Sequence, residues 1–269
     1  MKPIVDPDLY DQDYYLKSNV GRDEFLAGLE TSPIHPKYQS VLNYCRFSPE
    51  KTVLDIGCGR GELVYYAARG GCGKTVGIDY SRSAIELANT FKNRLPEGLK
   101  SRMHFYHTDV KDWAESEPFD YIFLVETWEH MHDYQIKPLL GKAAKLLKKD
   151  GLLILTTPNG LYERYLYPAK RLTNIPLNLF KFPLRILRGK WKPRSFRELV
   201  QNIFKVYPLD DVFLDQTHVN VSSPGKIKRM LKENGLAGRV ICSDSSKNLL
   251  SLMFSKWAGR EMIVIASKK

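Results

Sequence analysis

The sequence predicts an α/β protein with a mostly parallel sheet and helices on both of its faces. Two observations carry this prediction. Short apolar runs alternate with amphipathic segments from residue 52 onward, and the first run ends directly in a glycine-rich loop. Such alternation is typical of right-handed βαβ units, and therefore of a parallel sheet. The 269 residues suffice for one such domain with a sizeable insertion.

The expected strands are short apolar runs, and polar residues, Gly or Pro separate one run from the next. Central parallel strands are buried on both faces, and the fourth run, YIFLV, is accordingly almost wholly apolar. In chain order the runs are Thr52–Ile56, Thr75–Ile78, Met103–His107, Tyr121–Val125, Leu152–Thr156, Arg239–Ser243 and Met262–Ala266.

The expected helices lie between these runs, and their ends carry capping signals. Ser81 is a good N-cap for a helix through Phe91, and Ser223-Pro224 begins another that runs to Asn234-Gly235. The segment Lys148-Lys149-Asp150-Gly151 predicts a cationic last turn followed by a glycine cap. The helices are expected at Pro36–Cys45, Glu62–Arg69, Ser81–Phe91, Ile136–Leu147 and Ser223–Asn234.

These elements divide the chain into three parts. Residues 1–50 form an N-terminal helical cap rich in Tyr, and residues 51–157 together with 217–269 form the core. Residues 158–216 have no clear strand and much Pro, aromatic and basic character. We interpret them as a helical insertion that recognises the substrate.

Composition narrows the class of protein. The hydrophobic fraction of 43% is ordinary for a globular protein, and no uncharged apolar run approaches the about 20 residues that span a membrane. The N-terminus has no apolar signal segment, so we expect a cytoplasmic protein, with peripheral membrane association left open. The four cysteines form no C-x-x-C pair and are expected to be reduced and mostly buried.

Most of the formal net charge of +11 lies in one stretch. Residues 160–205 contain eleven Lys and Arg but only two Asp and Glu, a difference of +9. The remainder of the chain is nearly neutral. A run of charge is by itself a weak signal of the partner, so the function of this stretch has to be interpreted together with its apolar residues.

The glycine-rich loop is Asp55-x-Gly57-x-Gly59-x-Gly61, directly after the first strand. Glycines there permit positive φ and close approach of a ligand to the backbone, at the edge of the sheet where α/β folds bind ligands. A dinucleotide site has the spacing G-x-G-x-x-G, which differs from the G-x-G-x-G found here. Asp79 ends the second strand, and its carboxylate can accept hydrogen bonds from both hydroxyls of a ribose. Dinucleotide sites have this feature too, so it does not discriminate by itself.

Four further segments follow the loop in order: Val76–Ser81, His107–Val110, Phe119–Ile122 and Leu147–Leu153. Together with Val53–Glu62 they resemble the successive motifs of class I S-adenosylmethionine-dependent methyltransferases. The resemblance covers residues 50–157 and 217–267, and the ordered set is highly specific. It implies a Rossmann-like, doubly wound sheet of seven strands with an antiparallel last strand, and S-adenosylmethionine as the cofactor.

The resemblance also implies which residues contact the cofactor. Three glycines would back its methionine part, one carboxylate would hold the ribose and a pair of residues would fix the adenine. These are, in that order, Gly57, Gly59 and Gly61, then Asp79, then Asp109 and Val110. Asp55, Tyr80 and Val125 complete the expected contacts, and Tyr14 and Tyr15 are expected to close over the cofactor.

A second cluster follows the fourth strand. Glu126 and Glu129 are three residues apart, so one helical turn would put them on the same side, and His130 comes next. His218 precedes the penultimate helix, in a loop that should return to the same end of the sheet. Two carboxylates and two imidazoles could bind Mg, Mn, Zn or Fe.

This E-x-x-E-H segment with a distal His is similar to the metal set of small-RNA 3′-terminal 2′-O-methyltransferases and of ubiquinone-pathway O-methyltransferases. The resemblance implies Glu126, Glu129, His130 and His218 as ligands of a metal that lowers the pKa of a substrate hydroxyl. Two alternatives stay open. His130 or His218, beside Glu129, would act as a metal-free general base, or the segment merely begins a helix with acidic residues near its positive end.

Residues 177–191 interleave apolar and cationic residues, and three interpretations compete. They form an interfacial helix facing anionic lipid or a lipid-like substrate, an RNA-binding surface, or a lid with solvated charges. The absence of a recognisable RNA-binding module disfavours RNA. A second amphipathic segment, Ser245–Trp257, would extend the wall of the site or form a homodimer contact.

The first hypothesis is therefore an O-methyltransferase for a hydroxylated small molecule that is lipid-linked, phenolic or glycosidic. An RNA 2′-O-methyltransferase is the second. A non-catalytic methyltransferase-like binding protein is the third, and the intact glycine loop and acidic cofactor residues disfavour it.

Overall fold

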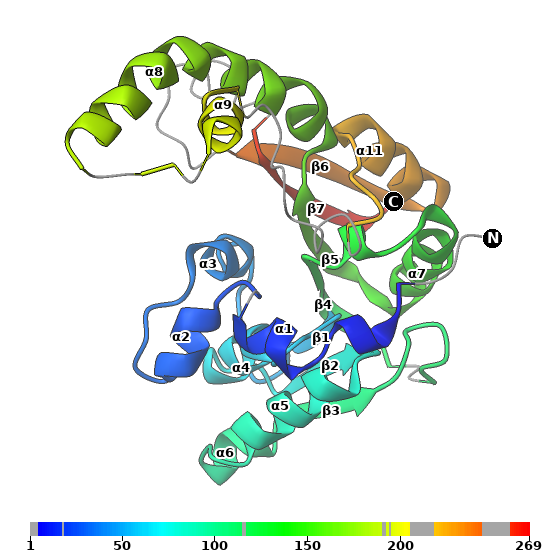
Figure 1. Ribbon diagram of the computed structural model, residues 1–269. Coiled ribbons are helices and arrows are strands. Elements are labelled where there is room, and N and C mark those ends of the chain that lie inside the picture. The colour runs from blue at the N-terminus through cyan, green and yellow to red at the C-terminus, as the bar shows by residue number, and fades with distance from the viewer. Residues whose placement is uncertain are drawn as a thin grey trace.

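The computed structural model describes residues 5–17, 19–114, 117–189, 192–193, 195–204, 218–243 and 259–269. Seven strands form one sheet in the order β3-β2-β1-β4-β5-β7-β6 (Figure 1). The strands are β1 (Thr52–Ile56), β2 (Lys74–Asp79), β3 (Met103–His107), β4 (Phe119–Val125), β5 (Leu147–Pro158), β6 (Leu236–Ser243) and β7 (Glu261–Lys268). Only β7 runs antiparallel to its neighbours, so the predicted fold class is confirmed.

Helices cover both faces of the sheet because its strands are apolar on both sides. In β4 all seven residues are buried, with Ile122 and Leu124 in one core and Phe123 in the other. The first core lies against α7 (Asp133–Leu146) and α11 (Pro224–Glu233), and the second against α3 (Pro36–Leu42) and α4 (Glu62–Arg69). The N-terminal half of the chain also contains η1 (Pro7–Leu9), α1 (Gln12–Lys17), α2 (Arg22–Ala27), α5 (Arg82–Lys92) and α6 (Glu97–Lys100).

The end of α7 differs from the prediction. The helix ends at Leu146, and the residues expected to form its cationic last turn and glycine cap belong to β5. Leu147 pairs with Phe119, and the register shifts between Phe119 and Tyr121. Lys148 forms an ion pair of 2.6 Å with Asp120 instead of interacting with the helix terminus. A Cβ at Gly151 would lie 3.0 Å from the carbonyl oxygens of Phe119 and Asp120, so glycine permits this close pairing.

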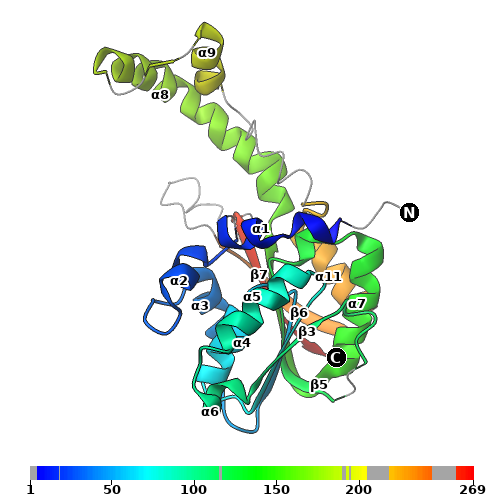
Figure 2. The same cartoon turned by 60° about the horizontal axis from the view of Figure 1, so that its bottom comes forward.

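The insertion after β5 is helical, as predicted. It consists of the π-helical turn η3 (Tyr162–Leu166), the long helix α8 (Tyr167–Leu187) and α9 (Phe196–Phe204). Figure 2 shows that α8 projects away from the sheet and carries α9 at its far end. No helix in the described ranges has both the length and the apolar character to cross a membrane. The predicted amphipathic segment Ser245–Trp257 lies outside the described residues.

The glycine loop also holds the N-terminal segment. The Arg60 side chain is fully buried, and its Nε donates to Glu62 Oε1 over 2.8 Å. Its two terminal nitrogens donate to the carbonyl oxygens of Tyr15 and Val20. One guanidinium therefore ties the start of α4 to the residues around α1. The four cysteines are free thiols and three of them are buried, as expected.

We predict that Arg60→Ala lowers the free energy of unfolding by about 3 kcal/mol or more, because it leaves the Glu62 carboxylate buried without its partner. Denaturant unfolding measures this, and Arg82→Ala serves as the control because Arg82 is exposed. The control should change stability by less than about 0.5 kcal/mol. Equal effects of the two substitutions would contradict the role of Arg60.

Candidate active site

The glycine loop wraps around the end of β2. The amides of Gly57 and Cys58 both donate to the carbonyl oxygen of Ile78, over 2.8 and 3.1 Å. Gly57 has φ of 75°, and a Cβ there would lie 2.5 Å from Thr127 Oγ1. Only glycine fits this position, since a side chain would strain the backbone and collide with the loop after β4.

The buried carboxylate of Asp79 joins this loop to the helix that follows β2. Its Oδ2 accepts from the amide of Gly59 over 3.0 Å, and its Oδ1 accepts from the amide of Ser81 over 2.8 Å. Burial raises the pKa of Asp79 to about 6, although these amides oppose the rise. Each carboxylate oxygen can accept more than one hydrogen bond, so the group can still receive the hydroxyls of a ribose.

Two adjoining cavities lie at this edge of the sheet. The larger measures about 480 Å³, and many of the residues predicted for the site line it. These are Asp55, Gly57, Gly59, Asp79, Tyr80, Val125, Glu126, Glu129, His130 and His218. The smaller cavity, about 70 Å³, is mainly apolar and lies between Asp79, Asp109 and Val110. This arrangement fits S-adenosylmethionine, with its adenine in the apolar cavity and its methionine part in the larger one.

Gly61 differs from its predicted role. It begins α4 with φ of 85°, and a Cβ there would lie 2.5 Å from the ring of Phe105. The glycine is therefore needed for packing α4 against β3, behind the loop that lines the cavity. Asp55 does line the cavity, and burial raises its pKa to about 8.

Four tyrosines from residues 1–50 line the larger cavity: Tyr10, Tyr14, Tyr15 and Tyr38. Tyr14 and Tyr15 were expected there, but Tyr10 was missed by sequence analysis. The Tyr10 carbonyl accepts from Ser81 Oγ over 2.7 Å, and its hydroxyl lies 2.9 Å from His130 Nδ1. Burial raises the pKa of the Tyr10 hydroxyl well above its ordinary value, which keeps it protonated at neutral pH. Only the frequency of Tyr in residues 1–50 hints at this role.

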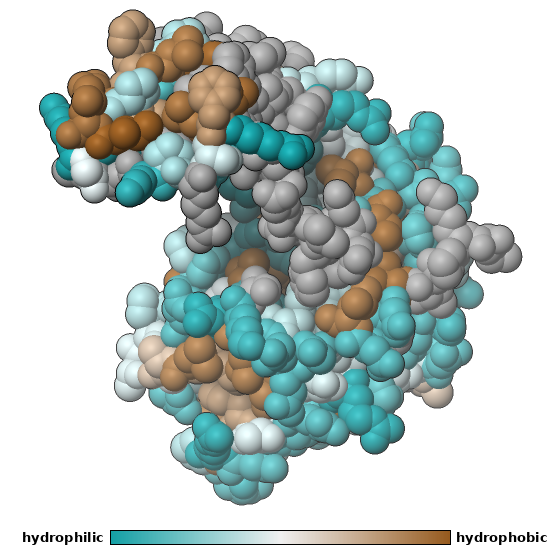
Figure 3. Space-filling view, viewed as in Figure 1, coloured by the Kyte–Doolittle hydropathy of each residue, from teal (hydrophilic) through white to brown (hydrophobic). Residues whose placement is uncertain are grey.

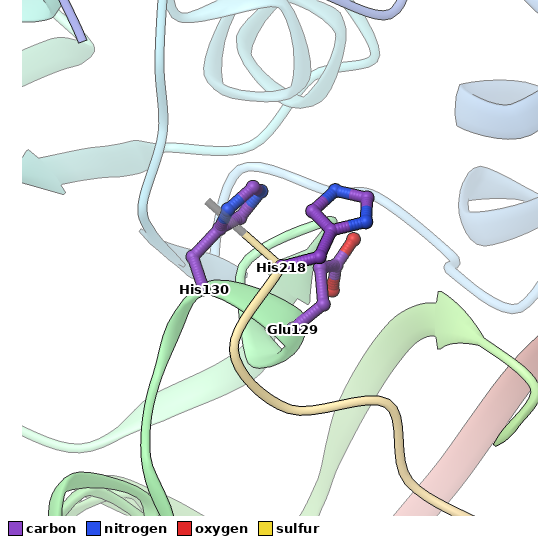
Figure 4. Close-up of side chains that lie close together, drawn as sticks. All are labelled: Glu129, His130 and His218. Carbon is purple, nitrogen blue, oxygen red and sulfur yellow. The ribbon is translucent and has the colours of Figure 1, made fainter. Parts of the chain in front are cut away.

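The second cluster contains three of the four predicted residues. Ligand atoms of Glu129, His130 and His218 lie within 4.8 Å of one another, and Figure 4 shows the three side chains converging. Glu129 belongs to the short helix η2 (Trp128–His130) and is fully buried. Within the part of the chain that the structure describes, neither of its carboxylate oxygens has a hydrogen-bond partner. Burial therefore raises its pKa, and the nearby Glu126 carboxylate raises it further.

Backbone and side-chain hydrogen bonds bring His218 to this cluster from a distant part of the sequence. The amide of Asn220 donates to the carbonyl of Glu129 over 3.0 Å. The Asn220 side chain donates to Met131, and Trp128 Nε1 donates to Ser222 Oγ over 3.0 Å. These hydrogen bonds hold the loop before α11 against η2. His218 in that loop therefore lies beside Glu129 and His130, at the end of the sheet where it was predicted to be.

Glu126 takes a different position from the one predicted. Its Oε2 forms an ion pair of 2.7 Å with Lys37, and its Oε1 accepts from Thr156 Oγ1 over 2.9 Å. Lys37 also lies 3.2 Å from Glu261 and is largely buried. Glu126 has φ of 51°, a left-handed conformation unusual for a non-glycine residue. The ion pair thus holds Glu126 against Lys37 of α3, so Glu126 lines the same cavity but lies outside the group formed by the other three residues. No motif in the sequence indicates Lys37.

Comparison with known proteins agrees with this geometry. Residues 33–240 match the family described as a methyltransferase domain. Because the match covers most of the chain, this protein belongs to that family, within the class I S-adenosylmethionine-dependent methyltransferases.

Individual relatives are more distant. The chain is 35% identical over 121 residues to a ubiquinone biosynthesis O-methyltransferase of Neisseria meningitidis, covering 44% of this chain and 48% of that one. It is 27% identical over 177 residues to (S)-coclaurine N-methyltransferase of Papaver somniferum, covering 58% and 49%. The chain therefore spans about half the length of these curated relatives.

A solved structure shares the fold across the whole chain. The magnesium protoporphyrin IX methyltransferase of Synechocystis PCC 6803, determined with bound S-adenosylmethionine, has a TM-score of 0.55 and 13% identity, and each chain is covered completely. At this identity the likeness concerns the fold alone.

We predict that Asp79→Ala lowers the affinity for S-adenosylmethionine at least tenfold. Charge-assisted hydrogen bonds contribute about 1.5–3 kcal/mol, and about 1.4 kcal/mol corresponds to a factor of ten. The affinity of the unaltered protein should also fall as the pH drops through about 6, because the protonated carboxyl loses its charge and part of its accepting capacity. Isothermal titration calorimetry measures both effects, with Asp112→Ala as the control because Asp112 is exposed. If both variants bind alike, Asp79 does not hold the ribose.

Proposed function

We propose that this protein transfers the methyl group of S-adenosylmethionine to a hydroxyl group of a small molecule. One observation supports this most directly. The cavity that contains the glycine loop and Asp79 also contains Glu129, His130 and His218, so a methyl donor and a proton acceptor would share one enclosure. The ubiquinone biosynthesis relatives are named as O-methyltransferases, which favours oxygen as the nucleophile.

The chemistry asks little of the protein beyond alignment and removal of one proton. S-adenosylmethionine supplies a methyl group that its sulfonium already activates. His130 or His218 would accept the hydroxyl proton as the acceptor oxygen bonds to the methyl carbon. The carbon–sulfur bond would break at the same time, and S-adenosylhomocysteine would leave as a neutral thioether. Tyr10 lies against Nδ1 of His130, so it would fix the orientation of that imidazole. The tyrosines of the N-terminal segment would exclude water from the cavity.

The same cluster fits a divalent cation. A buried carboxylate without a hydrogen-bond partner in the described ranges, beside two imidazoles, forms a mixed oxygen and nitrogen ligand set. Glu129, His130 and His218 would be its ligands, and the cation would lower the pKa of an acceptor hydroxyl. Glu126 would join them only by leaving Lys37, so we propose three protein ligands instead of the four implied by sequence resemblance.

We predict base-stable methylation when the protein is incubated with methyl-labelled S-adenosylmethionine and a fractionated cell extract. A methyl ether survives mild alkali, whereas a methyl ester releases methanol. Label that remains on the product after mild alkali is not in a methyl ester. If that product also survives acid and is not an amine, the label supports O-methylation. Label found only in amines or esters would contradict a hydroxyl acceptor.

The cluster itself is tested by Glu129→Gln and His218→Ala, with His104→Ala on β3 as the matched control. We expect each cluster variant to lower methyl transfer at least a hundredfold while S-adenosylmethionine affinity changes less than threefold, since general base and metal contributions are about 10²–10⁴-fold. Direct titration of Mn²⁺ and Zn²⁺ into the two cluster variants and the His104→Ala control distinguishes a metal mechanism from a metal-free general base. Cation binding that only the cluster variants lose supports the metal, and its absence in every protein overturns the metal but not the base.

A further inference from the structure

The helical insertion has an apolar surface that is exposed. Among the described residues, seven of the ten exposed large hydrophobic side chains lie between positions 161 and 196. Phe180 is 74% exposed, Leu187 is 83% exposed and Phe196 is 79% exposed. Figure 3 shows hydrophobic side chains gathered over α8 and α9, at the part of the molecule that projects farthest from the sheet in Figure 2.

These side chains follow the period of the helix. Phe180, Leu184 and Leu187 are spaced by four and three residues, so they form one stripe along the outer half of α8. The residues after each of them are Lys181, Arg185 and Arg188, and all three are exposed. A cationic stripe therefore runs directly beside the apolar stripe. On α9, Phe196 and Arg197 repeat the same pairing.

The base of this arm is anchored firmly to the core. Asn159 is fully buried, and its side chain donates to the Gly259 carbonyl over 2.9 Å and accepts from the amide of Leu161 over 3.0 Å. Gly160 donates to the Ser222 carbonyl, in the loop that also carries His218. The arm thus leaves the core beside the cavity of the active site.

We propose that the outer half of α8, with the start of α9, docks the protein on an anionic membrane surface. The apolar stripe would enter the boundary between headgroups and acyl chains, and the adjacent cations would contact acidic headgroups. The charge and the apolar stripe of this surface together favour an anionic membrane over other partners. Residues 160–205, within the insertion, carry a net charge of +9, which disfavours a second copy of the same basic surface. A nucleic acid would use the cations but leave the aliphatic stripe exposed to water.

The docked orientation also indicates the acceptor. Because the arm leaves the core beside the active-site cavity, the acceptor would be an amphiphile whose hydroxyl reaches the cavity from the membrane surface. This statement rests on the proposed function, whereas membrane docking does not.

Sedimentation with vesicles tests the docking without any catalytic measurement. The unaltered full chain should sediment with phosphatidylglycerol–phosphatidylcholine vesicles at low salt, less at high salt, and weakly with phosphatidylcholine alone. Arg185→Glu combined with Arg188→Glu should lower partitioning at least tenfold, because each basic residue near an anionic surface contributes about 1 kcal/mol. Leu184→Ser combined with Leu187→Ser should have a similar effect through lost apolar burial.

Two controls place equivalent changes elsewhere on the surface. Leu26→Ser removes an exposed leucine from α2, and Lys228→Glu reverses an exposed charge on α11. Both should partition like the unaltered protein, and all variants should retain its S-adenosylmethionine affinity.

Absence of vesicle binding at low salt, or equal loss in the controls, would overturn the proposal. Salt-sensitive binding of a labelled RNA in place of vesicles would overturn it in favour of a nucleic acid. Vesicle binding without methyl transfer to lipid extracts would leave docking intact and contradict only the amphiphilic acceptor.

Discussion

The buried carboxylate of Asp79 is the interaction on which the rest of the site depends. It accepts from Gly59 in the loop after β1 and from Ser81 at the start of α5, so one side chain sets the distance between two separate ligand-binding segments. Its charge is costly in a buried position, which explains the raised pKa. The two amides offset part of this cost, and hydroxyls of a bound ribose would offset more. Cofactor binding and the local structure therefore support each other.

The acceptor side of the cavity depends on contacts between distant segments. Trp128 and Ser222 join η2 to the loop before α11, and Arg60 binds the backbone carbonyl oxygens of Tyr15 and Val20. Glu129 is left with a fully buried carboxyl group whose oxygens have no hydrogen-bond partner among the described residues. Such groups are rare in folded proteins without a functional reason, so this carboxylate is the feature that most strongly favours chemistry at this position. The arm built from α8 and α9 begins beside the same cavity, so an acceptor drawn from the proposed membrane surface would lie close to the place of reaction.

Local sequence patterns predicted most of the core. The boundaries of β1, β3 and α4 were correct because apolar runs and glycines mark them. The start of β5 was wrong because Lys148 pairs with Asp120, a contact between strands that periodicity does not reveal. Long-range contacts also explain the errors at the site: Lys37 draws Glu126 away from its expected partners, and Tyr10 reaches His130 from 120 residues away. Sequence motifs indicated candidate residues for the site, whereas the fold decided which of them lie close together.

We expect the glycine loop after β1 and the carboxylate of Asp79 to bind S-adenosylmethionine and not a dinucleotide. The most direct measurement is calorimetric titration of the full chain with S-adenosylmethionine, S-adenosylhomocysteine and NAD in parallel. We expect that one S-adenosylmethionine binds per chain, that S-adenosylhomocysteine displaces it, and that NAD gives no heat of binding. Binding of NAD with no binding of S-adenosylmethionine would contradict it.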